Sequence, residues 1–349
     1  MSDNKPQPQI LPPTVEVKQR LQPEGVHFRP MLSAKLPSMV KQVPPEELII
    51  RDLKRLDWSR GFDASPKLDG IRAVKSPEGM VSRTLTPTPN RFVQDCLSPT
   101  IFNGLDGELV LGNPEDHIPF NDTQSAIQSQ DGSPFFTWCI FDDVLEPNNA
   151  FWWRTNKAME RVATMLEFGN FQELCRIYYV KHKNVKSIEE LLEYEAHQLS
   201  LGYEGIMFRD PGGRYKSFPS NRSTFKEQGL IKLKRFVDGE ARITGFVELE
   251  RNTNPQKLDK LGYAKRSHAI AGQVGGNTLG KLEVIGINGR FRGVKFYVAS
   301  GLDDHLRDLI WNNQPAYLNQ VVKYKFQDVG AKDAPRAPIF LGFRSREDL

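Results

Sequence analysis

The chain has 349 residues, of which 39% are hydrophobic and 10% aromatic, as expected for a globular protein with room for two domains. No apolar run approaches the ~20 residues that span a bilayer, and the polar N-terminus lacks the apolar core of a secretory signal. Cys96, Cys139 and Cys175 lie far apart, and the histidines show no metal-ligand spacing. We therefore expect a cytoplasmic protein without membrane contact and without a cysteine or histidine metal site.

The net charge of +4 is unevenly distributed along the chain. Residues 1–227 contain 27 basic and 30 acidic side chains, a net charge of −3, whereas residues 228–349 contain 20 and 13, a net charge of +7. A basic C-terminal third suggests a polyanionic partner. A basic domain without such a partner explains the charge equally well, so charge alone leaves the question open.

Turn residues and apolar spacing predict an alternation of strands and helices up to about residue 236. The proline-rich residues 1–25 are expected to form an extended arm, and Pro44 to Glu47 suit the first turn of a helix. Ser187 and Glu190 form a capping box, and Gly202 ends the helix that follows. Strands are predicted at 67–74, 79–83, 105–110, 135–144, 176–180, 204–209 and 230–235, with helices at 120–129, 154–168 and 188–201. The helix at 154–168 is expected to direct Met159, Val162, Met165 and Leu166 towards the core.

The pattern changes after residue 239. Strands are predicted at 242–249, 280–287, 290–299 and 321–327, with a helix at 302–311, which fits a small barrel such as an OB-fold. Residues 251–278 are polar and contain several glycines, and they predict a long mobile surface loop with Lys265 and Arg266 near its middle. We therefore expect an α+β domain of antiparallel sheets with flanking helices, followed by a β-barrel domain.

Lys67 lies between Pro66 and an Asp69-Gly70 turn, at the edge of a predicted strand. A lysine becomes a nucleophile when its pKa falls from about 10.4, and burial or nearby cations lower it. A solvated surface lysine is the commoner explanation of one such segment, because short motifs often match by accident. The interpretation of Lys67 therefore depends on partners elsewhere in the chain.

Two glutamates and then two lysines that could act with Lys67 follow it along the chain. Glu108 and Glu204 could supply the oxygen ligands that a divalent metal on a triphosphate requires. Lys232 and Lys234 could neutralise phosphate charge, and their repulsion would help to lower the pKa of Lys67. Each residue alone has a simpler explanation: Glu108 could close a surface turn, Glu204 could begin a solvated strand, and the two lysines could line an exposed sheet face. The four residues together, in this order, favour nucleotidyl transfer.

Two apolar side chains complete the candidate nucleotide site. Phe141 and Met207 lie in predicted strands and could flank a purine ring, although ordinary core packing explains either residue alone.

The ordered motifs resemble those of ATP-dependent DNA ligases of the covalent nucleotidyltransferase superfamily, in their small bacteriophage form. The matching segments are residues 65–72, 82–84, 105–110, 136–144, 204–209 and 230–235, with further likeness at 214–224, 262–267 and 338–344. The resemblance covers about residues 27–349. It implies a nucleotidyltransferase (adenylation) domain over 26–236 and an OB-fold DNA-binding domain over 237–349.

This resemblance implies a catalytic nucleophile and a reaction. Lys67 would attack ATP and hold AMP, AMP would pass to the 5′-phosphate at a nick in duplex DNA, and the 3′-hydroxyl would then seal the strand. The cofactors would be ATP and Mg²⁺ (or Mn²⁺). The enzyme would act as a monomer in DNA replication, repair and recombination, in the host-cell cytoplasm if a phage encodes it.

The resemblance also implies roles for individual residues. Arg72 and Glu108 would contact the ribose, and Phe141 and Met207 would enclose the adenine. Glu108 and Glu204 would hold the metal. The nucleotide-binding set is Ser65, Pro66, Lys67, Leu68, Arg72, Glu108, Phe141, Met207, Lys232 and Lys234. Arg83 would contact the nick phosphate, and Lys265, Arg266, Arg344 and Arg346 would contact DNA.

Two positions depart from the family pattern. Ser65 stands where related phage enzymes often carry an acid near the adenine. The C-terminal Arg-x-Asp-Lys motif is only partly matched at residues 344–348, which leaves open which cation orients the triphosphate. An RNA ligase, an mRNA-capping guanylyltransferase and an inactive nucleic-acid-binding relative remain alternatives. The intact Lys67 and its charged partners argue against the last.

Overall fold

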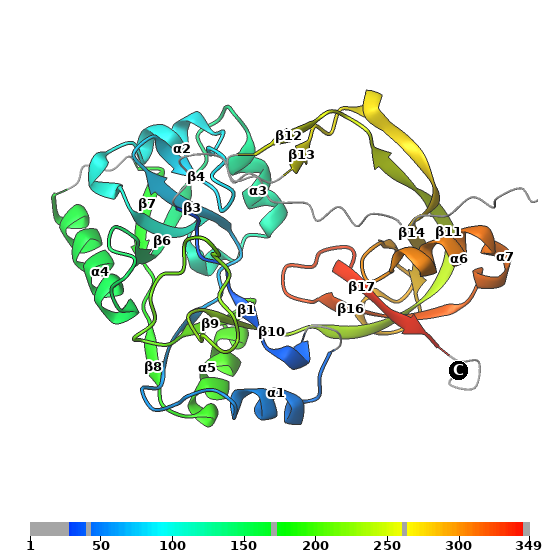
Figure 1. Cartoon of the computed structure of the whole chain (residues 1–349), viewed down its shortest axis with the longest axis horizontal. Helices are drawn as coiled ribbons and strands as arrows, with labels where there is room; N and C mark the ends of the chain where they lie inside the picture. The colour runs from blue at the N-terminus through cyan, green and yellow to red at the C-terminus, as the bar shows by residue number, and fades with distance from the viewer. Residues whose placement is uncertain (1–27, 40–42, 169–172, 260–263, 345–349) are drawn as a thin grey trace, which may run out of the picture.

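The computed structural model describes residues 28–39, 43–168, 173–259 and 264–344. The arm expected at 1–25 and Arg346 lie outside the described residues. Two lobes follow each other along the chain, an α+β lobe and a C-terminal β lobe with two short helices (Figure 1). No helix among the described residues is both long and apolar enough to cross a membrane.

The α+β lobe contains two five-stranded sheets. The first has the order β1-β10-β9-β2-β8 and the second β4-β3-β5-β6-β7. The first is formed by β1 (Ala34–Lys35), β10 (Ile231–Lys234), β9 (Gly205–Arg209), β2 (Phe62–Pro66) and β8 (Lys183–Val185). The second is formed by β4 (Gly79–Val81), β3 (Ile71–Ser76), β5 (Leu105–Leu111), β6 (Phe136–Asp143) and β7 (Cys175–Tyr179).

Helices supply a separate apolar core to each sheet. The helices α1 (Glu46–Leu53) and α5 (Ile188–Ser200) pack on the first sheet, and α2 (Arg91–Cys96), α3 (Phe120–Gln128) and α4 (Phe151–Phe168) on the second. A smaller cluster joins the two sheets through Val74 and Leu230, and another packs Val110 of the second sheet against Leu68 in the link between β2 and β3. The sheets therefore face each other across a thin apolar contact, beside which the main cavity opens.

The C-terminal lobe is one curled sheet with the order β15-β14-β11-β16-β17. Its strands are β11 (Val237–Asn252), β14 (Gln273–Gly286), β15 (Lys295–Val298), β16 (Val321–Gln327) and β17 (Arg336–Phe343), and α6 (Asp304–Asn312) and α7 (Gln314–Tyr317) precede β16. The Phe340 amide donates to the Ser300 carbonyl over 2.8 Å, which brings β17 beside the end of β15. This closure agrees with the predicted OB-like barrel.

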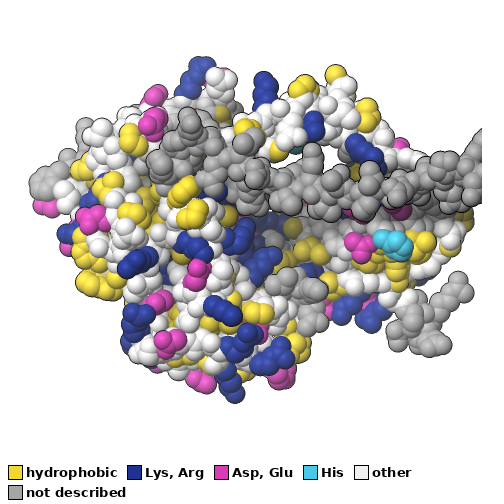
Figure 2. Space-filling model, viewed as in Figure 1, with side chains coloured by type: hydrophobic (Ala, Val, Ile, Leu, Met, Phe, Trp, Pro, Cys, Tyr) yellow, Lys and Arg dark blue, Asp and Glu magenta, His cyan; other side chains and the backbone are white. Residues whose placement is uncertain are grey.

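The prediction of a long loop at 251–278 is wrong for the residues of this segment that the structure describes. The strands β11 and β14 run on as a two-stranded ribbon, and β12 (Gln256–Leu258) pairs with β13 (Ala264–Arg266) at its far end. The ribbon extends away from the barrel at the top of Figure 1, and Lys and Arg side chains (dark blue) lie on this part of the molecule in Figure 2. A strand exposed on both faces needs no alternation of apolar and polar residues, so the usual sequence signal is missing.

Other elements differ more locally. The single strand predicted at 67–74 is broken, because β2 ends at Pro66 and β3 begins at Ile71. On α4, Val162 and Met165 are buried as predicted, whereas Met159 and Leu166 are 46% and 57% exposed. The strand β15 is shorter than predicted, and β17 was not predicted, since prolines and a glycine interrupt its pattern.

Candidate active site

Lys67 lies in the link that joins the two sheets of the α+β lobe. Its backbone amide donates to the Gly205 carbonyl over 2.9 Å, which ties it to the start of β9. Gly70 packs so closely on the Leu109 carbonyl that a side chain would overlap it, and Gly205 has φ +139° and lies equally close to Leu233. These glycines let the lysine segment cross between the sheets.

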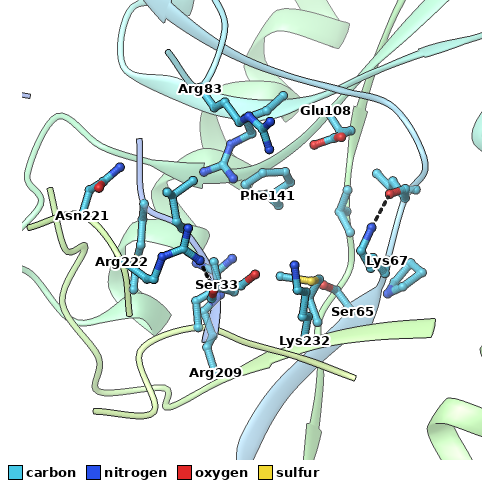
Figure 3. Close-up of a pocket in the computed structure, with 18 of the residues that line it drawn as sticks. Ser33, Ser65, Lys67, Arg83, Glu108, Phe141, Arg209, Asn221, Arg222 and Lys232 are labelled. Atoms are coloured by element: carbon cyan, nitrogen blue, oxygen red, sulfur yellow. Dashed lines mark hydrogen bonds between the residues drawn. The ribbon is translucent and has the colours of Figure 1, made fainter. Parts of the chain in front are cut away.

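A cavity of about 540 Å³ opens between the sheets beside Lys67 (Figure 3). Strands of both sheets contribute its walls. It brings together the predicted residues Ser65, Pro66, Lys67, Leu68, Arg72, Arg83, Glu108, Phe141, Met207 and Lys232. It also includes residues that were not predicted, among them Ser33, Arg209, Asn221 and Arg222.

Phe141 and Met207 give the cavity apolar surfaces. Phe141 packs with Leu68 in the small cluster at the sheet edge, and Met207 lies opposite Ser65 in the β2–β9 register. The Arg72 guanidinium carbon lies 4.7 Å from the centre of the Phe141 ring. The cavity therefore offers apolar contacts to a planar base next to a cationic side chain.

Arg72 is held by a fully buried carboxylate that the sequence interpretation overlooked. Arg72 donates twice to Asp106, and the Tyr215 hydroxyl donates to the same carboxylate over 2.7 Å. Burial lowers the pKa of Arg72, but the Asp106 charge outweighs it and raises the pKa above its usual value. Asp106 and Glu108 are two residues apart on β5, and this spacing was the available sequence signal.

Glu204 bridges two lysines at the other side of Lys67. Its side chain is 1% exposed and accepts hydrogen bonds from Lys67 and Lys234. Burial lowers the pKa of Lys67, but the Glu204 carboxylate prevails and raises it. The expected depression appears instead at Lys234 and Lys232, where burial together with the Lys67 charge lowers each pKa to about 8.

Glu108 is a half-buried carboxyl group whose pKa is raised to about 7. Burial is the main cause, and the charges of Arg72 and Lys67 oppose it. The described residues contain no cluster of three or more His, Cys, Asp or Glu side chains that could hold a metal. Two carboxylates, Glu108 and Glu204, still fit Mg²⁺, which commonly uses one or two carboxylates together with phosphate and water.

The C-terminal lobe contributes Arg336 to a second cavity next to Lys67. This cavity, of about 840 Å³, lies between Lys67, Glu204 and Lys234 and the segment from Gln327 to Ala337. Arg336 donates to Asp69 over 2.8 Å and has a second nitrogen 3.6 Å from Glu204. Arg336 was not among the predicted site residues, because nothing in its spacing links it to Lys67.

The other predicted cations lie elsewhere. Arg83 is exposed and lines both cavities. Lys265 and Arg266 are exposed on the ribbon, outside the residues that line either cavity. Arg344 donates to Glu240 over 2.6 Å on the C-terminal lobe.

A buried ionic network supports the side of the main cavity where Phe141 lies. Asp142, next to Phe141, accepts hydrogen bonds from Arg154 and Arg209, each over 2.8 Å. Burial raises the pKa of Asp142, but the two guanidinium groups outweigh it and lower the pKa below its usual value. Since Arg209 also lines the cavity, this network fixes the backbone that carries Phe141.

The C-terminal lobe carries the decisive likeness to known proteins. Residues 276–344 match the family model of the DNA ligase OB-like domain. The chain as a whole resembles the minimal ATP-dependent DNA ligases. It therefore combines an adenylation domain with an OB-like domain, as was expected from the sequence.

Individual ligases resemble the chain to different extents. The DNA ligase of African swine fever virus (strain Badajoz 1971 Vero-adapted) is 24% identical over 193 residues, and the match spans 52% of this chain but only 43% of the viral protein. The Chlorella virus DNA ligase-adenylate is 28% identical and covers 90% of this chain and 99% of its own, with a TM-score of 0.48. A Lig E DNA ligase shares the fold, with a TM-score of 0.58 and 22% identity over 84% of this chain and 95% of its own.

Proposed function

We propose that this chain seals 5′-phosphate/3′-hydroxyl nicks in duplex DNA with ATP, through a lysyl-AMP and a DNA-adenylate. One observation carries the proposal. Lys67 faces a cavity shared with Glu108 and Lys232, next to Glu204 and Lys234, in a chain whose C-terminal lobe matches a DNA ligase OB-like domain.

In the first step, the neutral Lys67 amine attacks the α-phosphorus of ATP. A P–N bond forms, the bond to the bridging oxygen breaks, and pyrophosphate leaves with the electron pair. The amine loses a proton as the phosphoramidate forms. Lys232, Lys234 and Arg336 surround the phosphate end of the site and would neutralise the charge that develops there.

Lys67 must first lose the proton that Glu204 stabilises. In the described arrangement the Glu204 carboxylate holds Lys67 in its charged form, which cannot attack. Glu108 and Glu204 would hold Mg²⁺, which would supply Lewis-acid polarisation of the triphosphate. A Glu204 carboxylate engaged in this way would stabilise the charged form of Lys67 less. Lys232 and Lys234 would then favour the neutral amine by repulsion.

The later steps transfer AMP to DNA and release it. An oxygen of the nick 5′-phosphate attacks the phosphorus of lysyl-AMP, the P–N bond breaks, and Lys67 regains a proton. The 3′-hydroxyl then attacks the 5′-phosphorus, loses its proton, and expels AMP. Arg83 lies at the mouth of both cavities and is the residue we assign to the nick phosphate.

Duplex DNA would be held mainly by charge on the C-terminal lobe and its ribbon. Residues 228–349 carry a net charge of +7, and Lys265 and Arg266 are exposed at the far end of the ribbon. Such contacts read the phosphate backbone rather than the bases. We propose that a monomer suffices, because one chain provides every assigned group.

A nick-sealing assay tests the proposal. A duplex with a labelled 5′-phosphate at a DNA nick should be joined with ATP and Mg²⁺, whereas the same duplex with a 5′-hydroxyl should not. Joining only at an RNA nick would indicate an RNA ligase, and covalent transfer of GMP rather than AMP would indicate a guanylyltransferase. Absence of both joining and covalent nucleotide would contradict the proposal and favour an inactive binding protein.

A further inference from the structure

The loop between β16 and β17 touches the α+β lobe at two points on one short helix. Lys332 Nζ lies 2.9 Å from Asp122 Oδ2, and the Arg336 guanidinium carbon lies 5.4 Å from the centre of the Phe120 ring. Phe120 begins α3 and Asp122 is in its first turn. In Figure 1, α3 lies at the side of the α+β lobe that faces the C-terminal lobe.

These two contacts differ from the acidic contacts of Arg336. Asp69 and Glu204 pair with the same guanidinium that faces Lys67 and Lys234. A triphosphate in this cavity would compete with both carboxylates for Arg336. The ion pair between Lys332 and Asp122 involves neither those carboxylates nor Arg336 itself, so it can hold the loop while Arg336 turns from Asp69 to a phosphate.

The α3 contacts are also spaced to fix the loop's orientation. Lys332 and Arg336 are four residues apart, with Pro335 between them to stiffen the segment. Asp122 and Phe120 are two residues apart on a rigid helical turn. The ion pair is weak alone, since Lys332 and Asp122 are 52% and 48% exposed. It holds the loop four residues before Arg336, and the Phe120 ring on the same helix limits where the guanidinium can lie.

We propose that α3 is the docking platform that positions Arg336 over the triphosphate, with Asp122 and Phe120 as its positioning residues and Lys332 as the partner of Asp122. This inference rests on the proposed function. It predicts an effect confined to the transfer of AMP to Lys67. Once pyrophosphate has left, no triphosphate remains for Arg336 to contact, so sealing of a nick that already carries AMP does not need the platform.

Charge reversal and its repair provide the test. The variants Asp122→Lys, Lys332→Asp and the double variant are compared by single-turnover labelling of Lys67 across ATP concentrations, and by joining of a pre-adenylylated nick. Each single variant should slow labelling at limiting ATP about three- to ten-fold, since attraction becomes repulsion at a partly exposed pair. The double variant should recover most of that loss, and joining of the pre-adenylylated nick should stay within about two-fold of the unmodified chain. Phe120→Leu should slow labelling in the same selective way.

Asp95→Lys is the matched control, because Asp95 is an exposed acid on α2 of the same lobe. Its substitution changes the net charge by the same amount as Asp122→Lys. Equal effects of Asp95→Lys and Asp122→Lys would overturn the inference. So would a double variant no faster than the single ones, or equal losses of labelling and of joining. If the unmodified chain takes no label, the proposed function itself fails. If it labels normally and Asp122→Lys labels equally well, only the docking role fails.

Discussion

At the scale of single residues, the proposed chemistry depends on the pair that Lys67 and Glu204 form. The sequence predicted both residues, but it suggested a lysine with a lowered pKa. In the structure the Glu204 carboxylate raises the pKa of Lys67 despite its burial. The direction of this pKa shift could not be predicted from the sequence, because it depends on whether the buried acid or the neighbouring lysines lie closer to the Lys67 amine.

Glu204→Gln is expected to lower the pKa of Lys67 in the nucleotide-free protein. Removing the carboxylate charge removes the largest influence that raises this pKa and leaves burial to lower it, against smaller opposing effects of Glu108 and Asp69. The pH dependence of Lys67 modification by an amine-reactive reagent, followed by peptide mass spectrometry, measures this. Modification at pH 8 should be faster in Glu204→Gln than in the unmodified chain, and unchanged in Glu227→Gln, which removes an acid paired with Lys216. Equal rates in all three proteins would refute the assigned cause.

Glu108 predicts a pH dependence for metal-assisted nucleotide binding. Its pKa is raised to about 7, so the carboxyl group binds a proton below that pH and is ionised above it. Since a metal ligand must be ionised, Mg²⁺-dependent ATP binding should weaken up to about ten-fold between pH 8 and pH 6. Calorimetry should show this loss in the unmodified chain and a flat profile in Glu108→Gln. A profile that strengthens towards pH 6 would contradict the assignment.

At the scale of elements, the ribbon of β11 and β14 shows where the pattern of apolar and polar residues fails to predict a strand. Buried strands such as β5 and β6 were predicted nearly to their ends because apolar and β-branched residues mark them. The ribbon was predicted as a loop because both of its faces meet solvent. The break between β2 and β3 was missed for another reason, since Lys67 and Ile71 belong to different sheets and only the fold separates them.

The hairpin at the end of the ribbon should hold DNA through charge. Lys265→Ala should weaken binding to a nicked duplex and reduce the slope of log affinity against log salt by about 0.9 if one phosphate contact is lost. Arg266→Ala should have a larger effect, because Arg266 also donates to the Asn254 carbonyl within the hairpin. Titrations at several salt concentrations measure both, with Lys157→Ala on α4 as a control. An unchanged slope in both hairpin variants would place the DNA contacts elsewhere.

Contacts between the lobes determine the site at the scale of the whole molecule. The sequence predicted an adenylation domain followed by an OB-like barrel, and both are present. It placed the cation for the triphosphate at residues 344–348, of which the structure describes Arg344, paired with Glu240. Among the described residues, Arg336 lies beside Lys67 and was not predicted. Contacts between segments 267 residues apart, such as Arg336 with Asp69, leave no local pattern to detect. The domain boundary between residues 236 and 237 stays a prediction, which limited proteolysis can test.

Arg336→Ala should separate the first step from the last. Losing charge-assisted contacts to phosphate typically costs about 1.5–3 kcal/mol, so labelling of Lys67 should fall at least about ten-fold. Joining of a pre-adenylylated nick should be nearly unaffected. Arg344→Ala is the control, because Arg344 pairs with Glu240 rather than with the site. Equal losses of labelling in the two variants would mean that Arg336 has no special role.

Covalent labelling of Lys67 tests the central claim most directly. The protein is incubated with Mg²⁺ and ATP labelled on the α-phosphate, denatured, and compared with Lys67→Ala. We predict label that survives denaturation, is released as AMP by acid as expected of a phosphoramidate, and maps to the Lys67 peptide. Label that persists in Lys67→Ala, or no label in the unmodified protein, would contradict the mechanism.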